Sequence, residues 1–354
     1  MNNKNIILVT GGAGFIGSNY IINHLNKYTE DTIINLDKLT YSGNLENLAD
    51  INSNSGYFFI KGDINDKGLL AEIFSGSYKK IPEPNKVIHF AAESHVDRSI
   101  NDSSPFVVTN VLGTQNLLDV AKKFWNEDYA DKRFIHVSTD EVYGELEEDG
   151  LFTEQTPLAP NSPYSASKAG SDLIARSYYQ TFGIPVIITR CSNNYGYFQF
   201  PEKLIPLMIN NIINKKHLPV YGKGLNVRDW LYVVDHCIAI DTVLEKGRVG
   251  EVYNIGGNNE WKNIDIVEEI CFLIDKKLGH NFDSKSLITF VEDRLGHDFR
   301  YAIDNTKIST ELGWQPSVTF DQGLSRTIDW YLNNQQWLNH VTSGDYQEYY
   351  QKFY

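Results

Sequence analysis

The chain has 354 residues, of which 42% are hydrophobic and 22% charged, and its formal net charge is −13 at pH 7. This composition is typical of a globular protein large enough for one extended core and a smaller lobe. The acidic balance argues against a nucleic-acid partner, although backbone N–H groups can still hold one phosphate-bearing ligand in a local pocket.

The chain contains three cysteines, Cys191, Cys237 and Cys271. They are too few for a disulfide-stapled secreted domain, and their spacing matches no zinc site. His89, His95 and His136 also lack metal-ligand spacing, so no metal is predicted. The apolar start of the chain is too short for a signal peptide, and no apolar run approaches the ~18 residues of a membrane span. We therefore expect a cytoplasmic protein with no membrane partner.

In chain order, the first half alternates β-rich runs with amphipathic helical patterns. The predicted strands are Ile6–Thr10, Thr32–Asp37, Tyr57–Lys61, Val87–Ala91, Phe134–Ser138 and Pro185–Arg190. The predicted helices are Phe15–Leu25, Lys67–Phe74, Phe106–Trp125 and Tyr164–Phe182. This alternation predicts an α/β fold with a Rossmann-like, doubly wound parallel sheet covered by helices on both faces.

The amino-acid composition changes after residue 190, where Asn, Pro, Gly and aromatic residues become frequent. The elements predicted there are a helix at Lys203–Asn214, a strand at Glu251–Ile255 and a helix at Ile264–Leu278. We predict a dinucleotide-binding domain over residues 1–190, with returning segments near 230–258, and a smaller C-terminal α/β substrate-binding lobe over residues 191–354. The aromatic-rich tail Tyr346–Tyr354 is assigned no role.

A glycine-rich loop separates the first predicted strand from the first helix. Gly11, Gly14 and Gly17 follow the pattern G-x-x-G-x-x-G. Glycines allow a tight turn and a close approach of a pyrophosphate, which the helix N-terminus attracts. Glycines also cluster in plain turns, but the strand–loop–helix context favours a dinucleotide site.

Two acidic positions suggest which dinucleotide binds. Asp37 ends the second strand, where a carboxylate binds the ribose 2′-OH of NAD and repels the extra phosphate of NADP. The alternative is an aspartate that only caps the following turn. Asp63 and Ile64 follow the third strand and are placed near the adenine, on weaker grounds of spacing.

Tyr164 and Lys168 form a Y-x-x-x-K pattern on a predicted helix, so both side chains share one face. An ammonium one turn from a phenol, together with an oxidised nicotinamide, is expected to lower the tyrosine pKa toward that of a working base. Alone, the pattern also fits an exposed helix with unrelated side chains. The glycine loop upstream favours the catalytic interpretation.

Thr139, Asp140 and Glu141 follow the fifth predicted strand. The carboxyl ends of parallel strands line the ligand crevice of such a sheet. Two neighbouring carboxyls disfavour double ionisation, so one can stay protonated as an acid while the other acts as a base. A solvated turn, or a helix N-cap at Asp140, is the structural alternative.

With these motifs in place, the chain resembles the extended short-chain dehydrogenase/reductase family. The motifs that carry the resemblance are Gly11–Gly17, Ala91–Asp97, Ser138–Gly144 and Tyr164–Lys168. The Thr-Asp-Glu triplet is similar to that of sugar-nucleotide 4,6-dehydratases. Further matches to those acting on dTDP-glucose are Asp37–Asn44, Cys191–Gly196, Pro201–Pro206, Arg228–Val233 and Asp293–Asp298. The resemblance runs from about Lys4 to Leu332, with departures at Leu295, where the family usually has proline, and within Tyr195–Phe200.

The resemblance implies an NAD-dependent hydro-lyase. Tyr164, helped by Lys168 and Thr139, would take the 4-OH proton of the hexose as hydride leaves C4 for NAD. Glu141 would then remove the C5 proton while Asp140 protonates the departing 6-OH. Return of hydride to C6 would give a 4-keto-6-deoxy sugar, and the cofactor would end the cycle unchanged.

The resemblance also assigns binding residues and a homodimer built through Phe106–Trp125 and Tyr164–Phe182. The implied cofactor residues are Gly11, Gly14, Phe15, Ile16, Gly17, Asp37, Lys38, Leu39, Thr40, Gly43, Asp63, Ile64, Phe90, Ala91, Ala92, Glu93, Ser94, Thr109, Tyr164, Lys168 and Asn194. The implied nucleotide-sugar residues are Ser94, Thr139, Asn193, Lys203, Leu204, Pro219, Val220, Tyr221, Arg228, Asn263, Asp293, Arg294 and His297. Arg228 and Lys203 suit a diphosphate, although both also fit surface charge.

Other functions stay open. A UDP-sugar 4-epimerase, or a dehydratase for GDP-mannose or UDP-sugars, would share most of these motifs. Asp140-Glu141 argues against the epimerase, which needs only the oxidation pair. A non-catalytic NAD-binding regulator could share the fold, but the complete set of five catalytic candidates argues against it. Selectivity for the base rests on the resemblance alone.

Overall fold

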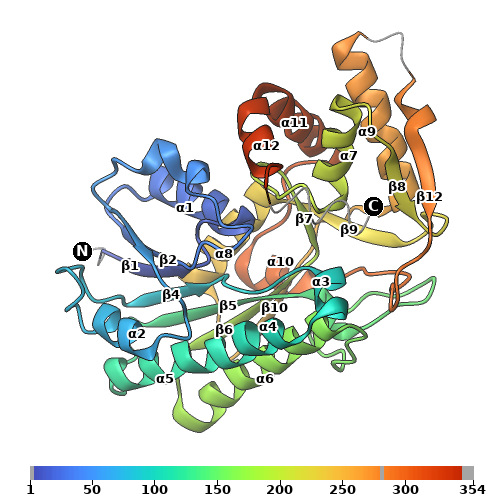
Figure 1. Cartoon of the computed structure of the whole chain (residues 1–354). Helices are drawn as coiled ribbons and strands as arrows, with labels where there is room; N and C mark the ends of the chain where they lie inside the picture. The colour runs from blue at the N-terminus through green and yellow to red at the C-terminus, as the bar shows by residue number, and fades with distance from the viewer. Residues whose placement is uncertain (1–3, 280–282, 345–354) are drawn as a thin grey trace.

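The fold is described from a computed structural model of the chain, which defines residues 4–279 and 283–344 (Figure 1). The aromatic-rich tail Tyr346–Tyr354 lies outside the described residues. No helix within the described ranges combines the length and apolar character needed to cross a membrane.

A seven-stranded parallel sheet forms the base of the molecule. Its strands are β1 (Ile6–Thr10), β2 (Thr32–Asp37), β3 (Tyr57–Lys61), β4 (Lys86–His89), β5 (Arg133–Thr139), β6 (Val186–Cys191) and β10 (Val252–Ile255). They lie in the order β10-β6-β5-β4-β1-β2-β3, and each pair is parallel. The order reverses between β1 and β4, which opens a crevice at the carboxyl ends of the strands. The predicted doubly wound α/β fold is confirmed.

Helices cover both faces of this sheet (Figure 1). Helices α1 (Phe15–Lys27) and α8 (Val233–Lys246) pack together on one face, and α2 (Lys67–Phe74), α5 (Thr114–Trp125) and α6 (Pro163–Phe182) lie on the other. Every residue of β2 is buried. Burial on both faces explains why the strands are nearly continuous apolar runs instead of alternating ones.

The predicted helix Phe106–Trp125 is interrupted in the structure. A short helix α4 (Ser104–Phe106) continues into a π-helical segment η2 (Val107–Gly113) before α5 begins. Asn110 in this segment donates its side-chain N–H to Ser167 Oγ at 2.8 Å and accepts from the Glu93 backbone N–H at 2.8 Å. Hydrophobic periodicity cannot reveal a π-helical segment, because the segment only widens part of one continuous helix.

The second half of the chain builds a smaller lobe with its own core. A three-stranded sheet is formed by β7 (Asn193–Tyr195), β9 (Val227–Tyr232) and β11 (Glu260–Lys262), and a two-stranded sheet by β8 (Leu218–Tyr221) and β12 (Ile288–Val291). The core helices are α7 (Leu204–Ile213), α9 (Asn263–Leu278), α11 (Phe320–Asn333) and α12 (Gln335–Val341). The remaining elements are η1 (Leu45–Ile51), α3 (Val96–Asn101), η3 (Asp140–Tyr143), η4 (Ser284–Leu287) and α10 (Thr306–Leu312).

The chain returns to the large sheet after it has entered the small lobe. Helix α8 packs on α1, and β10 pairs in parallel with β6, with Val252 opposite Ile188. The polypeptide therefore crosses between the two parts more than once.

A buried ion cluster holds α1 against α8. His24 lies 2.8 Å from Asp241 through Nδ1 and 3.2 Å from Asp31 through Nε2. Burial alone would lower the pKa of His24, but the hydrogen bonds to Asp241 and Asp31, and their charges, raise it to about 9. The imidazolium is therefore the form that stabilises the fold.

This cluster predicts a loss of stability at alkaline pH. Because the folded pKa of His24 lies above its unfolded value, its contribution is complete below about pH 6.5 and is lost as the pH rises through about 9. The loss should be on the order of 3 kcal/mol in the free energy of unfolding. Urea titrations at pH 6 and 9.5 measure it. A His24→Gln variant should have a lower free energy of unfolding at pH 6 and should lose little more of it at pH 9.5. An equal loss in both proteins would contradict the assignment.

Candidate active site

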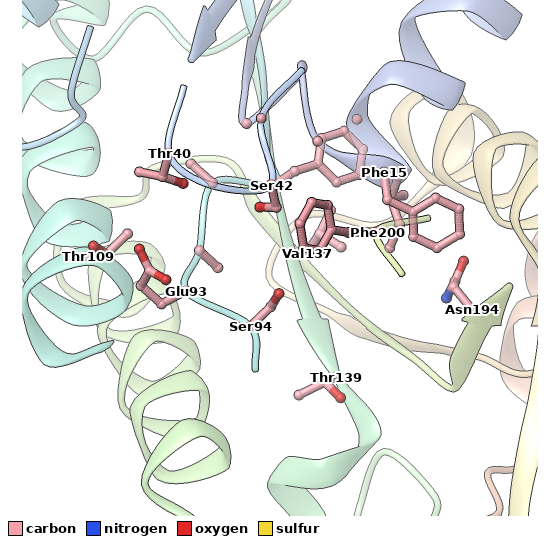
Figure 2. Close-up of a pocket in the computed structure, with 18 of the residues that line it drawn as sticks. Phe15, Thr40, Ser42, Glu93, Ser94, Thr109, Val137, Thr139, Asn194 and Phe200 are labelled. Carbon is pink, nitrogen blue, oxygen red and sulfur yellow. The ribbon is translucent and has the colours of Figure 1, made fainter. Parts of the chain in front are cut away.

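A cavity of about 310 Å³ opens at the carboxyl ends of the central strands, where the strand order reverses. Figure 2 shows Thr40, Glu93 and Thr109 on one side of it, with Phe15 and Asn194 on the other. A volume of this size is within the range of small-molecule sites. The cavity therefore occupies the position at which open α/β sheets bind their ligands.

The glycine loop forms one wall, and two of its positions admit only glycine. Gly11 has φ +74°, and a Cβ there would lie 2.7 Å from the Ala91 backbone nitrogen. A Cβ on Gly17 would lie 2.3 Å from the Gly11 carbonyl oxygen. Gly14 forms the N-cap of α1. The loop thus brings bare backbone and the helix N-terminus to the cavity, as a pyrophosphate requires.

Asp37 ends β2 at the rim of the cavity. One carboxylate oxygen accepts from the Ala13 N–H at 2.9 Å and the other from the Leu39 N–H at 2.7 Å. Burial raises the pKa of Asp37, and these two hydrogen bonds oppose the rise. Asp37 therefore caps the loop, as the structural alternative requires, while its position on the cavity wall also suits a ribose. Nearby, Lys38 and Asp63 form an ion pair at 2.8 Å.

The Tyr164–Lys168 pair lies on the first turns of α6. Ser162 and Ser165 form a capping box at the start of this helix, and the Tyr164 N–H donates to Ser99 Oγ at 3.1 Å. Lys168 Nζ donates to the Val137 carbonyl at 2.8 Å, which ties the helix to β5. The same strand ends at Thr139, so helix and strand present their polar groups to the cavity together.

The electrostatics of Tyr164 differ from the expectation. Burial raises the pKa of its phenol well above the usual range, the charge of Glu141 raises it further, and a hydrogen bond with Thr139 opposes the rise. Burial also lowers the pKa of Lys168. The lowering of the tyrosine pKa expected from Lys168 is therefore not found in the protein alone, because loss of water around the phenol outweighs it.

The two carboxyls on η3 differ in their surroundings. Burial and the neighbouring charge of Glu141 raise the pKa of Asp140 well above its usual range. Burial also raises the pKa of Glu141, but Arg294, Lys203 and Arg228 lower it. The pKa of each carboxyl is therefore raised. Arg228 opposes the rise at both groups, whereas Arg294 and Lys203 oppose it at Glu141.

Cations from the small lobe approach this pair. Lys203 Nζ donates to the Ser94 carbonyl at 2.9 Å and lies on the cavity wall. Arg228 is buried, donates to the Asp298 carbonyl at 2.7 Å and stacks on the Tyr301 ring at 4.2 Å. These cations offset negative charge beside Glu141.

The structure brings most predicted residues together. All five catalytic candidates and every predicted cofactor residue except Leu39 line the cavity, as do Ser94, Asn193 and Lys203 of the predicted substrate residues. Leu39 does not, because it adopts φ 56° and its side chain turns toward Gly43.

The other predicted substrate residues do not line this cavity. They are Leu204, Pro219, Val220, Tyr221, Arg228, Asn263, Asp293, Arg294 and His297. Several belong to a neighbouring part of the small lobe, where the Tyr221 ring lies 6.1 Å from that of His297. Two of them nevertheless face the site, because the charges of Arg228 and Arg294 act on Glu141, and Arg294 also lies 3.6 Å from Asp97 on α3.

Sequence reasoning missed several lining residues. They are Leu36, Ser42, Gly62, Val137, Ser138, Cys191, Ser192, Gln199, Phe200 and Glu202. Most are direct chain neighbours of predicted residues at strand ends, and this adjacency was the available signal. Glu202 gave none. It is buried and accepts from the Tyr41 hydroxyl at 2.9 Å and from Arg98 Nε at 3.2 Å.

The cavity fits a dinucleotide. Ser138 Oγ, Gln199 Oε1 and Asp140 Oδ2 are buried on its wall without a hydrogen-bond partner among the described residues. Buried polar atoms normally find partners, so these atoms suit a polar ligand, as does the cradle at Gly11 and Gly17. Across residues 4–279 and 283–344, no group of three or more His, Cys, Asp or Glu side chains is arranged to hold a metal ion.

Comparison with known proteins agrees with this geometry. The family model described as GDP-mannose 4,6 dehydratase matches residues 8–327. The chain is 52% identical to dTDP-glucose 4,6-dehydratase of Salmonella typhimurium, over 98% of each chain. It is 50% identical to dTDP-glucose 4,6-dehydratase 1 of Escherichia coli, again over 98% of each chain.

Solved structures of a dehydratase and an epimerase have similar folds but differ in sequence identity to this chain. DesIV of Streptomyces venezuelae, a dTDP-glucose 4,6-dehydratase with NAD and TYD bound, has a TM-score of 0.85 and 47% identity, covering 95% of this chain and 99% of that one. UDP-glucose 4-epimerase of Thermotoga maritima has a TM-score of 0.81 but 28% identity, covering 93% and 99%. This chain belongs to the nucleotide-sugar dehydratase family of the GDP-mannose 4,6-dehydratase model, among the relatives of dTDP-glucose 4,6-dehydratase.

Proposed function

We propose that this chain is an NAD-dependent dTDP-glucose 4,6-dehydratase, which converts dTDP-glucose to dTDP-4-keto-6-deoxyglucose and water. One observation carries the proposal. The phenol–ammonium pair Tyr164–Lys168 and the carboxyl pair Asp140–Glu141 line the same cavity beside the glycine loop. An epimerase needs only the first pair, whereas elimination of water needs an acid and a base as well.

In this proposal the large sheet supplies the cofactor site, and the small lobe supplies residues that bind the nucleotide sugar. The loop Gly11–Gly17 would hold the pyrophosphate of NAD and Asp37 its adenosine ribose. Bound NAD would supply a reversible hydride acceptor for the chemistry between C4 and C6 of the hexose. Lys203 is placed to attract the diphosphate of the substrate.

The protein's own groups then move three protons. Tyr164 accepts the 4-OH proton as C4 becomes a ketone, and the ketone acidifies the hydrogen on C5. Glu141 takes that proton while Asp140 gives its own to the 6-oxygen, so that the C6–O bond breaks and water leaves. Glu141 returns its proton to C5 as C6 receives hydride. The proton gained by Tyr164 balances the one lost by Asp140, and water is the only by-product.

The surroundings of the two carboxyls support these roles. Asp140 has burial and the charge of Glu141 against its ionisation, which suits a general acid. Burial raises the pKa of Glu141, and the charges of Arg294, Lys203 and Arg228 oppose the rise, which suits a base.

Product analysis tests the proposal. The purified protein with bound NAD is incubated with dTDP-glucose, UDP-glucose and GDP-mannose, and the 4-keto-6-deoxy product is followed by its absorbance in alkali. We expect product from dTDP-glucose at the highest rate. A C4 epimer without this absorbance would establish the epimerase instead. NAD binding without turnover of any nucleotide sugar would favour the regulatory protein.

Two helices expose apolar side chains that support a homodimer. Val107, Val108 and Leu112 on η2 are 45–54% exposed, and Leu173 on the adjoining α6 is 57% exposed. Contiguous exposed apolar surface of this kind commonly marks an interface. We infer that a second copy covers it.

The three cysteines are free and buried, which agrees with work in the reducing cytoplasm.

Charges on this surface should break the dimer. We expect a Val108→Asp/Leu173→Asp variant to elute at half the mass of the wild type in size-exclusion chromatography with light scattering, because a carboxylate is costly to bury at an interface. Phe272→Asp is the matched control, since Phe272 is 54% exposed on α9 of the small lobe. A wild-type monomer, or dissociation caused equally by Phe272→Asp, would refute this interface.

A further inference from the structure

The catalytic lysine lies in surroundings that oppose its charge. The Lys168 side chain is buried, and burial lowers its pKa. A lysine must keep its proton to favour the phenolate of Tyr164. The active site therefore needs a counter-charge close to Lys168 that does not itself enter the cavity.

Asp172 meets this description. It follows Lys168 by four residues on α6, so the two side chains share one face of the helix. Asp172 is 1% exposed and does not line the cavity. Its carboxylate lies 2.8 Å from Arg190 Nε on β6 and 3.3 Å from His136 Nε2 on β5. The aspartate is thus anchored to both strands, one helical turn after Lys168.

We propose that Asp172 is the positioning residue that keeps the Lys168 ammonium charged beside Tyr164. The inference rests on the proposed function of the site and adds a member to it. Asp172 acts through Lys168 and touches neither substrate nor cofactor. Arg190 and His136 hold its carboxylate ionised and prevent it from turning away.

Among residues 4–279 and 283–344, the other titratable groups near the pair do not supply this charge. Those that face it are His89 on β4, His136 on β5, Cys191 on β6, Asp140 and Glu141 on η3, and Tyr164 and Asp172 on α6. Burial lowers the pKa of both histidines and raises that of Cys191 to about 12, so these three groups are neutral. Asp140 and Glu141 act on Tyr164 and change protonation during the proposed cycle. Asp172, with a pKa of about 2 set by His136 and Arg190 against burial, stays an anion throughout.

The pH dependence of kcat tests this role. In Asp172→Asn, we expect the alkaline limb of kcat to move toward neutral pH by about one unit or more, because Lys168 loses its proton more easily. KM for dTDP-glucose should change less than about two-fold, since Asp172 does not reach the cavity. Asp172→Glu, which keeps the charge, should restore the limb. A merely structural role would lower the amount of folded enzyme without moving the limb.

Two further variants make the result decisive. Asp241→Asn is the matched control, because it also removes a buried carboxylate from an ion pair, in this case the pair with His24. It should leave the alkaline limb of kcat at its wild-type pH. If Asp172→Asn does not fold, Asp172→Ser, which removes the charge with a smaller side chain, takes its place and should move the alkaline limb of kcat in the same direction. An unmoved limb in the neutral variant, or an equal shift in Asp241→Asn, would overturn the proposal. An inactive wild type would instead refute the proposed function.

Discussion

In a Glu141→Gln variant, we expect C4 of dTDP-glucose to be oxidised while the elimination of water slows by about 10²–10⁴-fold. The amide is close in size to the carboxylate but cannot accept the C5 proton. The C4 oxidation uses Tyr164 and Lys168, which this change leaves in place. Rapid-quench sampling of one turnover should therefore show a 4-keto-hexose that accumulates ahead of the 4-keto-6-deoxy product.

The control for this prediction is a neighbouring carboxylate outside the cavity. Glu147 is exposed on the loop after η3 and does not line the cavity, so Glu147→Gln should eliminate water at the wild-type rate. Elimination at the wild-type rate in Glu141→Gln would remove Glu141 from the role of base. If the oxidation step were lost as well, the separation of roles between the two pairs would be wrong.

Tyr164→Phe should stop the reaction one step earlier. Without the phenol, the 4-OH proton has no acceptor, so we expect kcat to fall by about 10²–10⁴-fold with neither ketone intermediate nor product. The ring itself remains, and its packing against Phe106 at 6.3 Å should keep the helix in place. Stopped-flow absorbance at the wavelength of reduced nicotinamide and product analysis measure the two losses separately.

A second tyrosine of the same helix supplies the control. The Tyr178 hydroxyl donates to Asp119 on α5, away from the cavity, so Tyr178→Phe should keep the wild-type kcat while losing one hydrogen bond. The NAD content of purified Tyr164→Phe should equal that of the wild type. A variant that oxidises C4 normally would show that another group is the base, and one that lacks NAD would show that the tyrosine serves mainly to bind cofactor.

Most of the large sheet could be predicted from sequence because its signals are local. Each strand is a short apolar run, each helix has its own periodicity, and the predicted ends agree with the structure within a few residues. The chemistry at the strand ends follows from the same patterns. Thr139 and Asp37 end parallel strands, and parallel strands carry their carboxyl ends to one edge of the sheet.

The exceptions involve contacts between distant segments. The π-helical segment η2 is held by Asn110, whose partner Ser167 lies on another helix. Glu202 enters the site through Tyr41 and Arg98, which belong to other parts of the chain. The local pattern around these residues contains no trace of those partners.

The sequence by itself determined the sheet, the glycine cradle and the positions of a phenol and two carboxyls at the ends of a helix and a strand, because each depends on neighbours only a few residues away. Only the tertiary structure decided their electrostatic state. It raises the pKa values of Tyr164 and Asp140 through burial, and it brings Arg190 and His136 to Asp172, one helical turn after Lys168. The physical reason is that loss of water around a group depends on everything packed against it, and segments far apart in the chain supply that packing.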